Sequence, residues 1–438
     1  MSTNLRSKLR SNEAVRAPLS DFYAEFCDQI KKDFKLSDSA FHSGWSTGSA
    51  GALQHSRKLT ESVRLATSIV LDLLDTKYGD EREIEKTIFY VAHRSVEANS
   101  AIKLFIKDVL DALADTVFRS FSVFVPSYSV TLADGVDSFE LGDARLLTSK
   151  AAVIELNKCG ESPDDGSVDF VLSDDSRRII ADLGQSSVMV PSNSFMWCAK
   201  VESSAANADS EAEFLIDVTT SLISLLISQA SAFPRRAGDI VSHPTSSHEF
   251  EGHGFAKTGK DTRLFGARRA YQKHVITDTA IKDYSNSEQA TIVRLVHDGA
   301  KGAVAESVKT AMAWHAKGTQ STDPAFRLLY FFTAIEALLS RSSSDPVSET
   351  IARFGSTLIS SDVSRRSLNA FSIKKLYHFR SQTVHRGSRE TRWPEARAAQ
   401  NFLELSLKRI LNSKTLSLTR LRFLKELNDA SYGRELNL

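Results

Sequence analysis

The stretch AFRLLYFFTAIEALLS, from Ala325 to Ser340, is apolar on nearly every side of a helix and contains one acid, Glu336. A helix that is apolar all round must be covered by other elements, so this stretch is predicted to lie at the centre of a helical bundle. Asp323 and Pro324 directly precede it. A capping aspartate followed by proline at the first helical position is typical of a helix start.

Helical patterns lie on both sides of this stretch. Ser285 and Glu288 have the spacing of a capping box, which predicts a helix that closes at Lys317 and Gly318. Further helices are predicted over 347–358, 372–386, 394–411 and 415–427. Short connections between successive helices are typical of a bundle, so residues 285–438 are predicted to form a C-terminal α-helical bundle.

The earlier part of the chain shows two other patterns. Over residues 1–120, apolar side chains recur with the period of a helix, most clearly over 59–74 and 83–118. Over 121–284, short apolar runs alternate with turn residues, which predicts a mixed α/β region whose short strands include 152–156 and 195–201. The predicted fold class is therefore multidomain α+β, with a helical N-terminal region, a strand-rich middle region and the C-terminal bundle.

Composition and charge limit the possible classes of protein. The chain has 438 residues, of which 42% are hydrophobic and 25% charged, and this excludes a mainly disordered protein. The net charge is only +1, yet residues 361–438 contain 16 Lys and Arg against 7 Asp and Glu. Basic clustering favours polyanionic partners, although an ordinary solvated helix face explains the charge equally well.

Cysteines and apolar runs point to the compartment. The three cysteines, Cys27, Cys159 and Cys198, form no CxxC pair, so a cysteine-rich zinc site is excluded. An odd number of cysteines in a long chain fits a reducing compartment. The N-terminal residues lack the apolar core of a secretory signal, and no run approaches the roughly 18 apolar residues of a membrane span. We therefore expect a cytoplasmic protein without a membrane partner.

The segment LYHFRSQTVHRG, Leu376 to Gly387, contains an arginine and a histidine separated by four residues, Arg380 and His385. On a helix, side chains five positions apart differ by about 140° in direction and about 7.5 Å along the axis. The two side chains therefore do not share a face, but both could line one cleft if a second helix packs across the first. Such pairs are common by chance, so the spacing alone is a weak signal.

Three features in order give this part of the chain a family resemblance. They are the apolar helix with Glu336, the segment Lys375-Leu376-Tyr377-x2-Arg380-x4-His385-x-Gly387, and the helix after Pro394. Together they resemble the ApeA-like branch of the HEPN superfamily over about residues 285–415. Ser381 departs from the family, which often has an amide or an acid directly after the arginine.

The resemblance implies metal-independent RNA cleavage by a homodimer, with no metal or cofactor. The Arg-x4-His helices of two copies would face each other, with products ending in a 2′,3′-cyclic phosphate and a 5′-hydroxyl. His385 would transfer protons, Arg380 would stabilise charge on the phosphate, and Ser381 would be their polar neighbour. Family habit adds a toxin-like role in antiviral defence, with residues 1–284 binding a regulatory trigger.

Alternatives remain open for the individual residues. Glu336 is expected to pair with Arg380 or its neighbours and orient them, or else to form a structural ion pair inside the bundle. The cations around the motif could bind the RNA backbone or simply form a solvated face: Lys374, Lys375, Arg386, Arg389, Arg392 and Arg397. The alternative function is a non-catalytic module that binds RNA or protein through the same basic bundle.

The middle region contains two other candidate motifs. The string from Gly254 to Lys260 fits GxxxxGK, but Asp261 follows instead of the Ser or Thr that holds magnesium, so a phosphate-binding loop is not predicted. His243, His248 and His253 recur every five residues, which is not a standard zinc spacing. A polar loop is the better interpretation of this histidine-rich segment.

Overall fold

The computed structural model describes residues 9, 11–31, 57–74, 79–98, 100–117, 119–127, 130–160, 178–183, 186–191, 194–204, 207–226, 254–258, 261–265, 274–285, 287–321, 323–340, 347–387 and 390–436. The chain divides into two compact units, one of Met1–Val123 with Lys200–Ala212 and the other of Phe124–Ala199 with Glu213–Leu438. Helices predominate and the main sheet is small and antiparallel, as expected for an α+β protein. The further division predicted at residue 285 stays a prediction.

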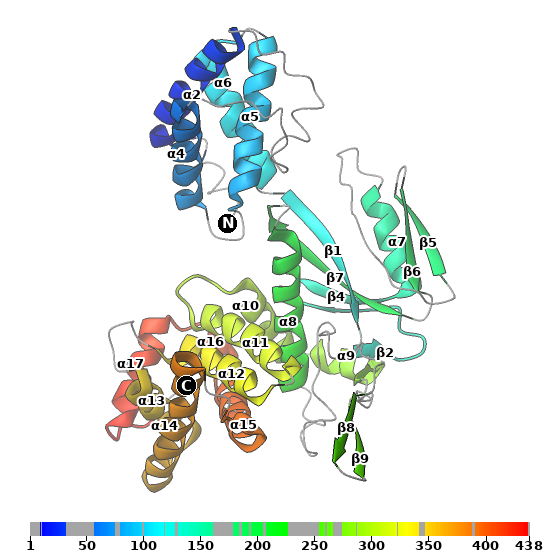
Figure 1. The fold of residues 1–438 in the computed structure, drawn as a ribbon. Helices are drawn as coiled ribbons and strands as arrows, with labels where there is room; N and C mark the ends of the chain where they lie inside the picture. Colours follow the sequence, from blue (N-terminus) through cyan, green and yellow to red (C-terminus); the bar gives the residue numbers. More distant parts are fainter. Residues whose placement is uncertain are drawn as a thin grey trace. The chain divides into compact units, whose positions relative to one another are not determined.

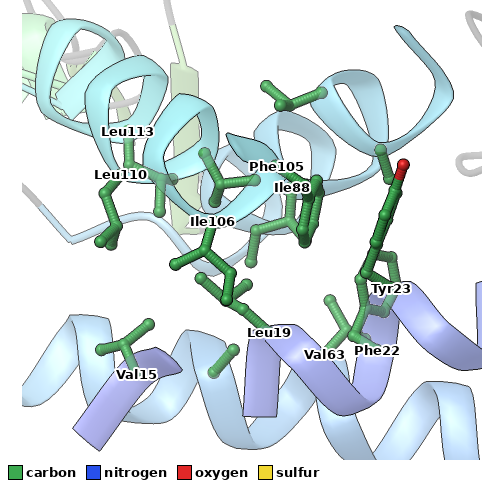
Figure 2. Close-up of a cluster of buried hydrophobic side chains, with 14 of the residues drawn as sticks. Val15, Leu19, Phe22, Tyr23, Val63, Ile88, Phe105, Ile106, Leu110 and Leu113 are labelled. Atoms are coloured by element: carbon green, nitrogen blue, oxygen red, sulfur yellow. The ribbon is translucent and has the colours of Figure 1, made fainter. Parts of the chain in front are cut away.

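The first unit contains four described helices, α2 (Glu13–Lys31), α4 (Arg57–Leu73), α5 (Glu81–Glu97) and α6 (Ile102–Val117). Figure 2 shows their apolar side chains meeting in one core, where the ring of Tyr23 stacks on Phe105 with centroids 4.1 Å apart. The residues over which one helical pattern was predicted, 83–118, belong to two helices, α5 and α6. Asp80 starts the first of them, because its carboxylate accepts a hydrogen bond from the amide of Glu83.

The middle of the chain forms a four-stranded sheet in the order β1 (Arg119–Ser127), β7 (Phe195–Ser203), β4 (Ala144–Thr148), β3 (Ser138–Leu141). Strand β4 pairs antiparallel with both of its neighbours. The strand predicted at 195–201 is confirmed as part of β7. The strand predicted at 152–156 is wrong, because these residues lie in helix α7 (Ser149–Gly160), where Ala152, Val153 and Leu156 share a buried face.

Three strand pairs complete the described β-structure. They are the hairpins β5 (Arg178–Leu183) with β6 (Ser186–Pro191) and β8 (Gly254–Thr258) with β9 (Asp261–Phe265), and the parallel pair β2 (Val130–Leu132) with β10 (His274–Ile276). The first five residues of the GxxxxGK string, Gly254–Thr258, thus form β8, with Thr258 opposite Asp261, whereas Gly259 and Lys260 lie outside the described residues. A strand pair on both sides differs from the strand, loop and helix of a phosphate-binding loop. His243, His248 and His253 lie outside the described residues.

The C-terminal part of the second unit consists of helices. They are α9 (Asp278–Tyr284), α10 (Ser287–Asp298), α11 (Val304–Gln320), α12 (Pro324–Leu339), α13 (Val347–Ile359), α14 (Val363–Arg386), α15 (Trp393–Ile410), α16 (Ser413–Leu416) and α17 (Arg420–Ser431). Helix α8 (Ala208–Leu226) comes earlier in the chain, and its residues up to Ala212 belong to the first unit. Helix α12 lies among α11, α13, α14 and α15, so its predicted central position is confirmed (Figure 1). None of the helices among the described residues is both long and apolar enough to cross a membrane.

Glycines explain where the helix boundaries differ from the predicted ones. The single helix predicted from Ser285 to Lys317 is two helices, because Gly299 and Gly302 have φ angles of +49° and +78° and turn the chain between them. Gly318 does not end a helix. A Cβ atom at this position would lie 2.4 Å from the Phe331 ring, so the glycine lets α11 and α12 pack closely.

Candidate functional site

Helix α14 carries the predicted Arg-x4-His motif and is well defined at both ends. Asp362 caps its N-terminus by accepting a hydrogen bond from the amide of Ser364. At the C-terminus Gly387 has a left-handed φ of +61°, and its amide donates to the carbonyl of Gln382. The glycine therefore ends the helix just after His385 and Arg386, as the sequence predicts.

Arg380 faces helix α12 and forms an ion pair there with Glu336. Its Nη2 atom lies 3.0 Å from the Glu336 Oε2 atom, and the two side chains are 19% and 22% exposed. The guanidinium carbon also lies 5.6 Å from the centre of the Tyr377 ring, which packs edge-on against Phe332. The expected pairing of Glu336 with Arg380 is thus present, and an aromatic ring supports the arginine from its own helix.

The hydrogen bonding of this pair is incomplete. The Nε of Arg380 and the Oε1 of Glu336 are buried atoms without a hydrogen-bond partner among the described residues. Burial raises the pKa of Glu336, while Arg380 acts in the opposite direction. Burial, and then the charge of Glu336, also raise the pKa of Tyr377. Spare hydrogen-bonding capacity in this partly buried pair is compatible with the binding of a further polar group at this position.

His385 and Ser381 occupy different surroundings. His385 is exposed near the end of α14, and Ser381 is partly buried directly after Arg380. Arg380 contacts α12 while His385 is exposed to solvent, as their separation of about 140° around the helix requires. One copy of the chain therefore does not bring the two groups together.

A second imidazole lies on the same row of α14 as His385. Seven residues are nearly two helical turns, so Phe371, His378 and His385 follow one line along the helix, and all three are exposed. The Nε2 of His378 lies 3.0 Å from the side-chain nitrogen of Gln382. The sequence interpretation missed His378, although its seven-residue spacing from His385 is readable in the sequence.

Much of helix α14 faces solvent. Only Ile373 and Leu376 are buried among its residues, whereas Leu368 and Phe371 are 70% and 71% exposed. Val363 and Val384 are exposed as well. Such an exposed apolar surface on a long helix is typical of a protein–protein contact.

The predicted RNA-binding cations differ in their environments. The ammonium group of Lys374 lies 2.6 Å from a carboxylate oxygen of Glu349 on α13, so part of its charge is already balanced. Lys375, Arg386 and Arg392 are exposed. Arg389 lies outside the described residues. The described cations next to the motif are therefore all exposed, and Lys374 is the one among them with a described ion pair to a carboxylate.

Helix α15 forms the described wall of a hollow of about 480 Å³. Its lining residues recur on one side of the helix: Trp393, Pro394, Arg397, Ala398 and Asn401. Arg397 was predicted only as one of several surface cations, and no role was predicted for Trp393 or Asn401. Their spacing of four residues is the signal that could have grouped them.

Comparisons with protein-family models, with curated proteins and with solved structures find no match to this chain. The resemblance to the HEPN superfamily therefore stays a prediction. No group of three or more His, Cys, Asp or Glu side chains within the described ranges is arranged to hold a metal ion.

Proposed function

We propose that the chain is a metal-independent endoribonuclease of the HEPN type that acts as a homodimer in the cytoplasm, as a toxin-like effector in antiviral defence. The observation that carries the proposal is the incompletely hydrogen-bonded Arg380–Glu336 pair on a helix that also presents His385 to solvent. The defence role follows from the family resemblance alone.

The proposed chemistry uses groups that RNA and this chain supply. The 2′-hydroxyl of RNA is the nucleophile. One His385 takes its proton, the oxygen attacks the adjacent phosphorus, and the bond from phosphorus to the 5′-oxygen breaks. Water gives a proton to this leaving oxygen, and the protonated His385 returns the proton that it took to the hydroxide that remains. The products are a 2′,3′-cyclic phosphate and a 5′-hydroxyl, and an imidazole is suited to both proton transfers near neutral pH.

Arg380 has the charge and geometry to stabilise the phosphate as negative charge develops. Its pair with Glu336 fixes one edge of the guanidinium and leaves Nε without a partner among the described residues. A positioned guanidinium can donate two parallel hydrogen bonds to phosphate oxygens. Glu336 and Tyr377 are proposed as positioning residues, and Ser381 as a polar neighbour of the phosphate.

The exposed surface of α14 supports the proposed dimer. Because Arg380 and His385 point in different directions, a second chain is needed to complete the site. Leu368 and Phe371, both strongly exposed, provide apolar area on the same helix for the contact. In a two-fold dimer the same surface of each copy would be covered, and each site would take groups from both chains.

Residues 1–284 are proposed to bind the regulatory trigger. The described helices of the first unit have their own aromatic core, built around Phe22, Phe89 and Phe105. A separate core supports a unit with a separate role.

The proposal is tested by incubating the purified full chain with RNA, with and without EDTA. We expect cleavage that EDTA leaves unchanged and that is lost in Arg380→Ala and in His385→Ala. Arg365→Ala is the matched control, because Arg365 is an exposed arginine in the first turn of α14 and its loss should leave cleavage unchanged. Cleavage that persists in both motif variants would contradict the proposal.

The alternative is a non-catalytic module that binds RNA or protein through the basic bundle. The partial burial of the Arg380–Glu336 pair favours it, because such a pair also serves to join two helices. This alternative predicts RNA binding that survives both motif substitutions, with no product at any protein concentration.

A further inference from the structure

We infer that α15 carries a subsite for an unstacked nucleobase of single-stranded RNA. The inference rests on the proposed function and names its substrate class, because a base can enter such a subsite only if it is not paired in a duplex. The subsite is the hollow of about 480 Å³ along the first turns of α15. A hollow of this size lies within the range of small-ligand sites.

Trp393 forms one wall of the hollow and is held in place by a buried cation. The guanidinium carbon of Arg327 lies 5.4 Å from the centre of the indole ring, and Arg327 is 8% exposed. Arg327 is itself fixed, because it donates hydrogen bonds to the carbonyl of Thr319 and to the side-chain oxygen of Gln400. The indole is therefore a preorganised surface, and little entropy is lost when a planar group packs against it.

Asn401 and Arg397 add polar groups to the same hollow. Both are exposed, and Arg397 lies one helical turn and Asn401 two helical turns beyond Trp393 on the same side of α15. The amide of Asn401 can donate and accept hydrogen bonds, which suits the edge of a base. The guanidinium of Arg397 can bind a phosphate or stack on a base.

Charge and position favour RNA as the source of the base. Exposed Arg392 and Arg397 lie at or beside the hollow, in the basic part of the chain. Helix α12 links this hollow to the motif, since Arg327 contacts Trp393 and Glu336 pairs with Arg380. The two positions on α12 are nine residues apart, about 13 Å along the helix axis. A short extended strand could therefore reach both.

The test measures binding of the full chain to a fluorescently labelled, single-stranded 2′-O-methyl oligonucleotide, which lacks the nucleophile and is not cleaved. We expect Trp393→Ala to weaken binding by about tenfold, as for the loss of one stacked base. Asn401→Ala should weaken it less, and Trp393→Phe should keep most of the affinity. An abasic oligonucleotide of the same length should bind weakly and to the same extent in all these variants.

Matched controls lie farther along α15. Leu405→Ala removes an exposed apolar side chain outside the hollow and should not change binding. Arg397→Gln and Arg409→Gln each remove one exposed positive charge from α15. Only Arg397→Gln should reduce the difference in affinity between the base-containing oligonucleotide and the abasic one. If both arginine variants weaken binding equally, and do so for the abasic probe too, the positive charge alone explains the affinity and the subsite is contradicted.

The outcomes separate this inference from the proposed ribonuclease activity. Base-dependent binding without any cleavage would support the subsite and contradict the ribonuclease. Normal cleavage, with oligonucleotide binding that is unchanged in Trp393→Ala and Asn401→Ala, would contradict the subsite and leave the ribonuclease standing. A mononucleotide that binds as tightly as the oligonucleotide would contradict RNA as the source of the base.

Discussion

Two arginines of the helical bundle, Arg327 and Arg380, have very different surroundings. Arg327, on α12, is 8% exposed and donates hydrogen bonds to two carbonyls and to Gln400. Arg380, on α14, is 19% exposed, pairs with one carboxylate oxygen and keeps an unpartnered Nε. The first has the hydrogen bonds that a buried cation needs for stability, and the second has spare hydrogen-bonding capacity.

The surroundings of Arg327 extend this contrast. Gln400 donates in turn to Glu404, whose carboxylate lies 3.3 Å from His315, and the other ring nitrogen of His315 lies 3.0 Å from Ser221. These side chains are buried and join α8, α11, α12 and α15. A continuous buried network of this kind fixes one arrangement of helices. We therefore expect the Arg327 region to contribute mainly to stability, and we propose the chemistry for the Arg380 region.

The largest expected effect is on RNA cleavage. Substitution of Arg380 by Ala should lower the cleavage rate by about a hundredfold or more, because a positioned donor to developing charge is lost. His385→Ala should have an effect of similar size on single-turnover rates. Neither change should alter the circular dichroism spectrum. An equal loss of cleavage in Arg365→Ala would show that general charge, not the motif, is responsible.

The free energy of unfolding should depend more on Arg327 than on Arg380. Arg327→Met should lower the free energy of unfolding by about 3 kcal/mol, because it leaves carbonyls and Gln400 without their buried donor. Arg380→Met should cost about 1 kcal/mol, since Glu336 is partly exposed and can take up a proton. Hydrogen exchange at the amides of α12 and α15 measures both losses. A larger loss in Arg380→Met would reverse the assignment.

The pH dependence of stability should depend on the ion pair. The pKa of Glu336 lies above its ordinary value of 4.5 in the folded chain, mainly because of burial. The folded state therefore binds this proton more tightly than the unfolded state, and stability falls as the pH rises from about 4.5 through the raised pKa. Arg380→Ala removes the charge that lowers this pKa, so the fall should be larger and continue to higher pH.

Glu336→Gln is the control for this titration. The variant has no carboxyl at this position, so the fall in stability should be absent, also when it is combined with Arg380→Ala. Denaturant midpoints measured between pH 4 and pH 8 would show the difference. If the double variant kept the same pH dependence as Arg380→Ala, another group would be titrating.

The sequence predicted what depends on local spacing. The apolar stretch around Phe331 identified the central helix, and Glu336, Arg380 and Gly387 lie where the pattern placed them. The prediction failed where contacts between distant residues decide which element a segment forms or where it ends. Gly318 lies inside a helix because Phe331 needs the space of its missing side chain. Ala152 and Leu156 belong to a helix although their short apolar run was interpreted as a strand.

The parts of the site that sequence analysis missed depend on contacts between distant residues. Arg327 and Trp393 are far apart along the chain, and only the packing of α12 on α15 brings the guanidinium over the indole. The first nine residues of α14 were missed because Val363, Leu368 and Phe371 are exposed and do not show the apolar stripe of a buried helix.

The smallest expected effects distinguish neighbouring lysines at the surface. Lys374 pairs with Glu349, whereas Lys375 is exposed on the next position of α14. Lys375→Ala should reduce the slope of RNA affinity against salt by about 0.7, the value for one phosphate contact on a single strand. Lys374→Ala should reduce it less, and its effect on stability should be below about 1 kcal/mol. Equal slopes would show that Glu349 does not matter for binding.

The most direct test of the central claim mixes two inactive chains. If each site takes Arg380 from one copy and His385 from the other, a mixed dimer of Arg380→Ala and His385→Ala contains one intact site. Equimolar mixing under conditions of subunit exchange should then restore cleavage to about a quarter of the wild-type rate, because half of the randomly formed dimers are mixed. A mixture that stays as inactive as either variant alone, although mixed dimers form, would contradict a site shared between two chains.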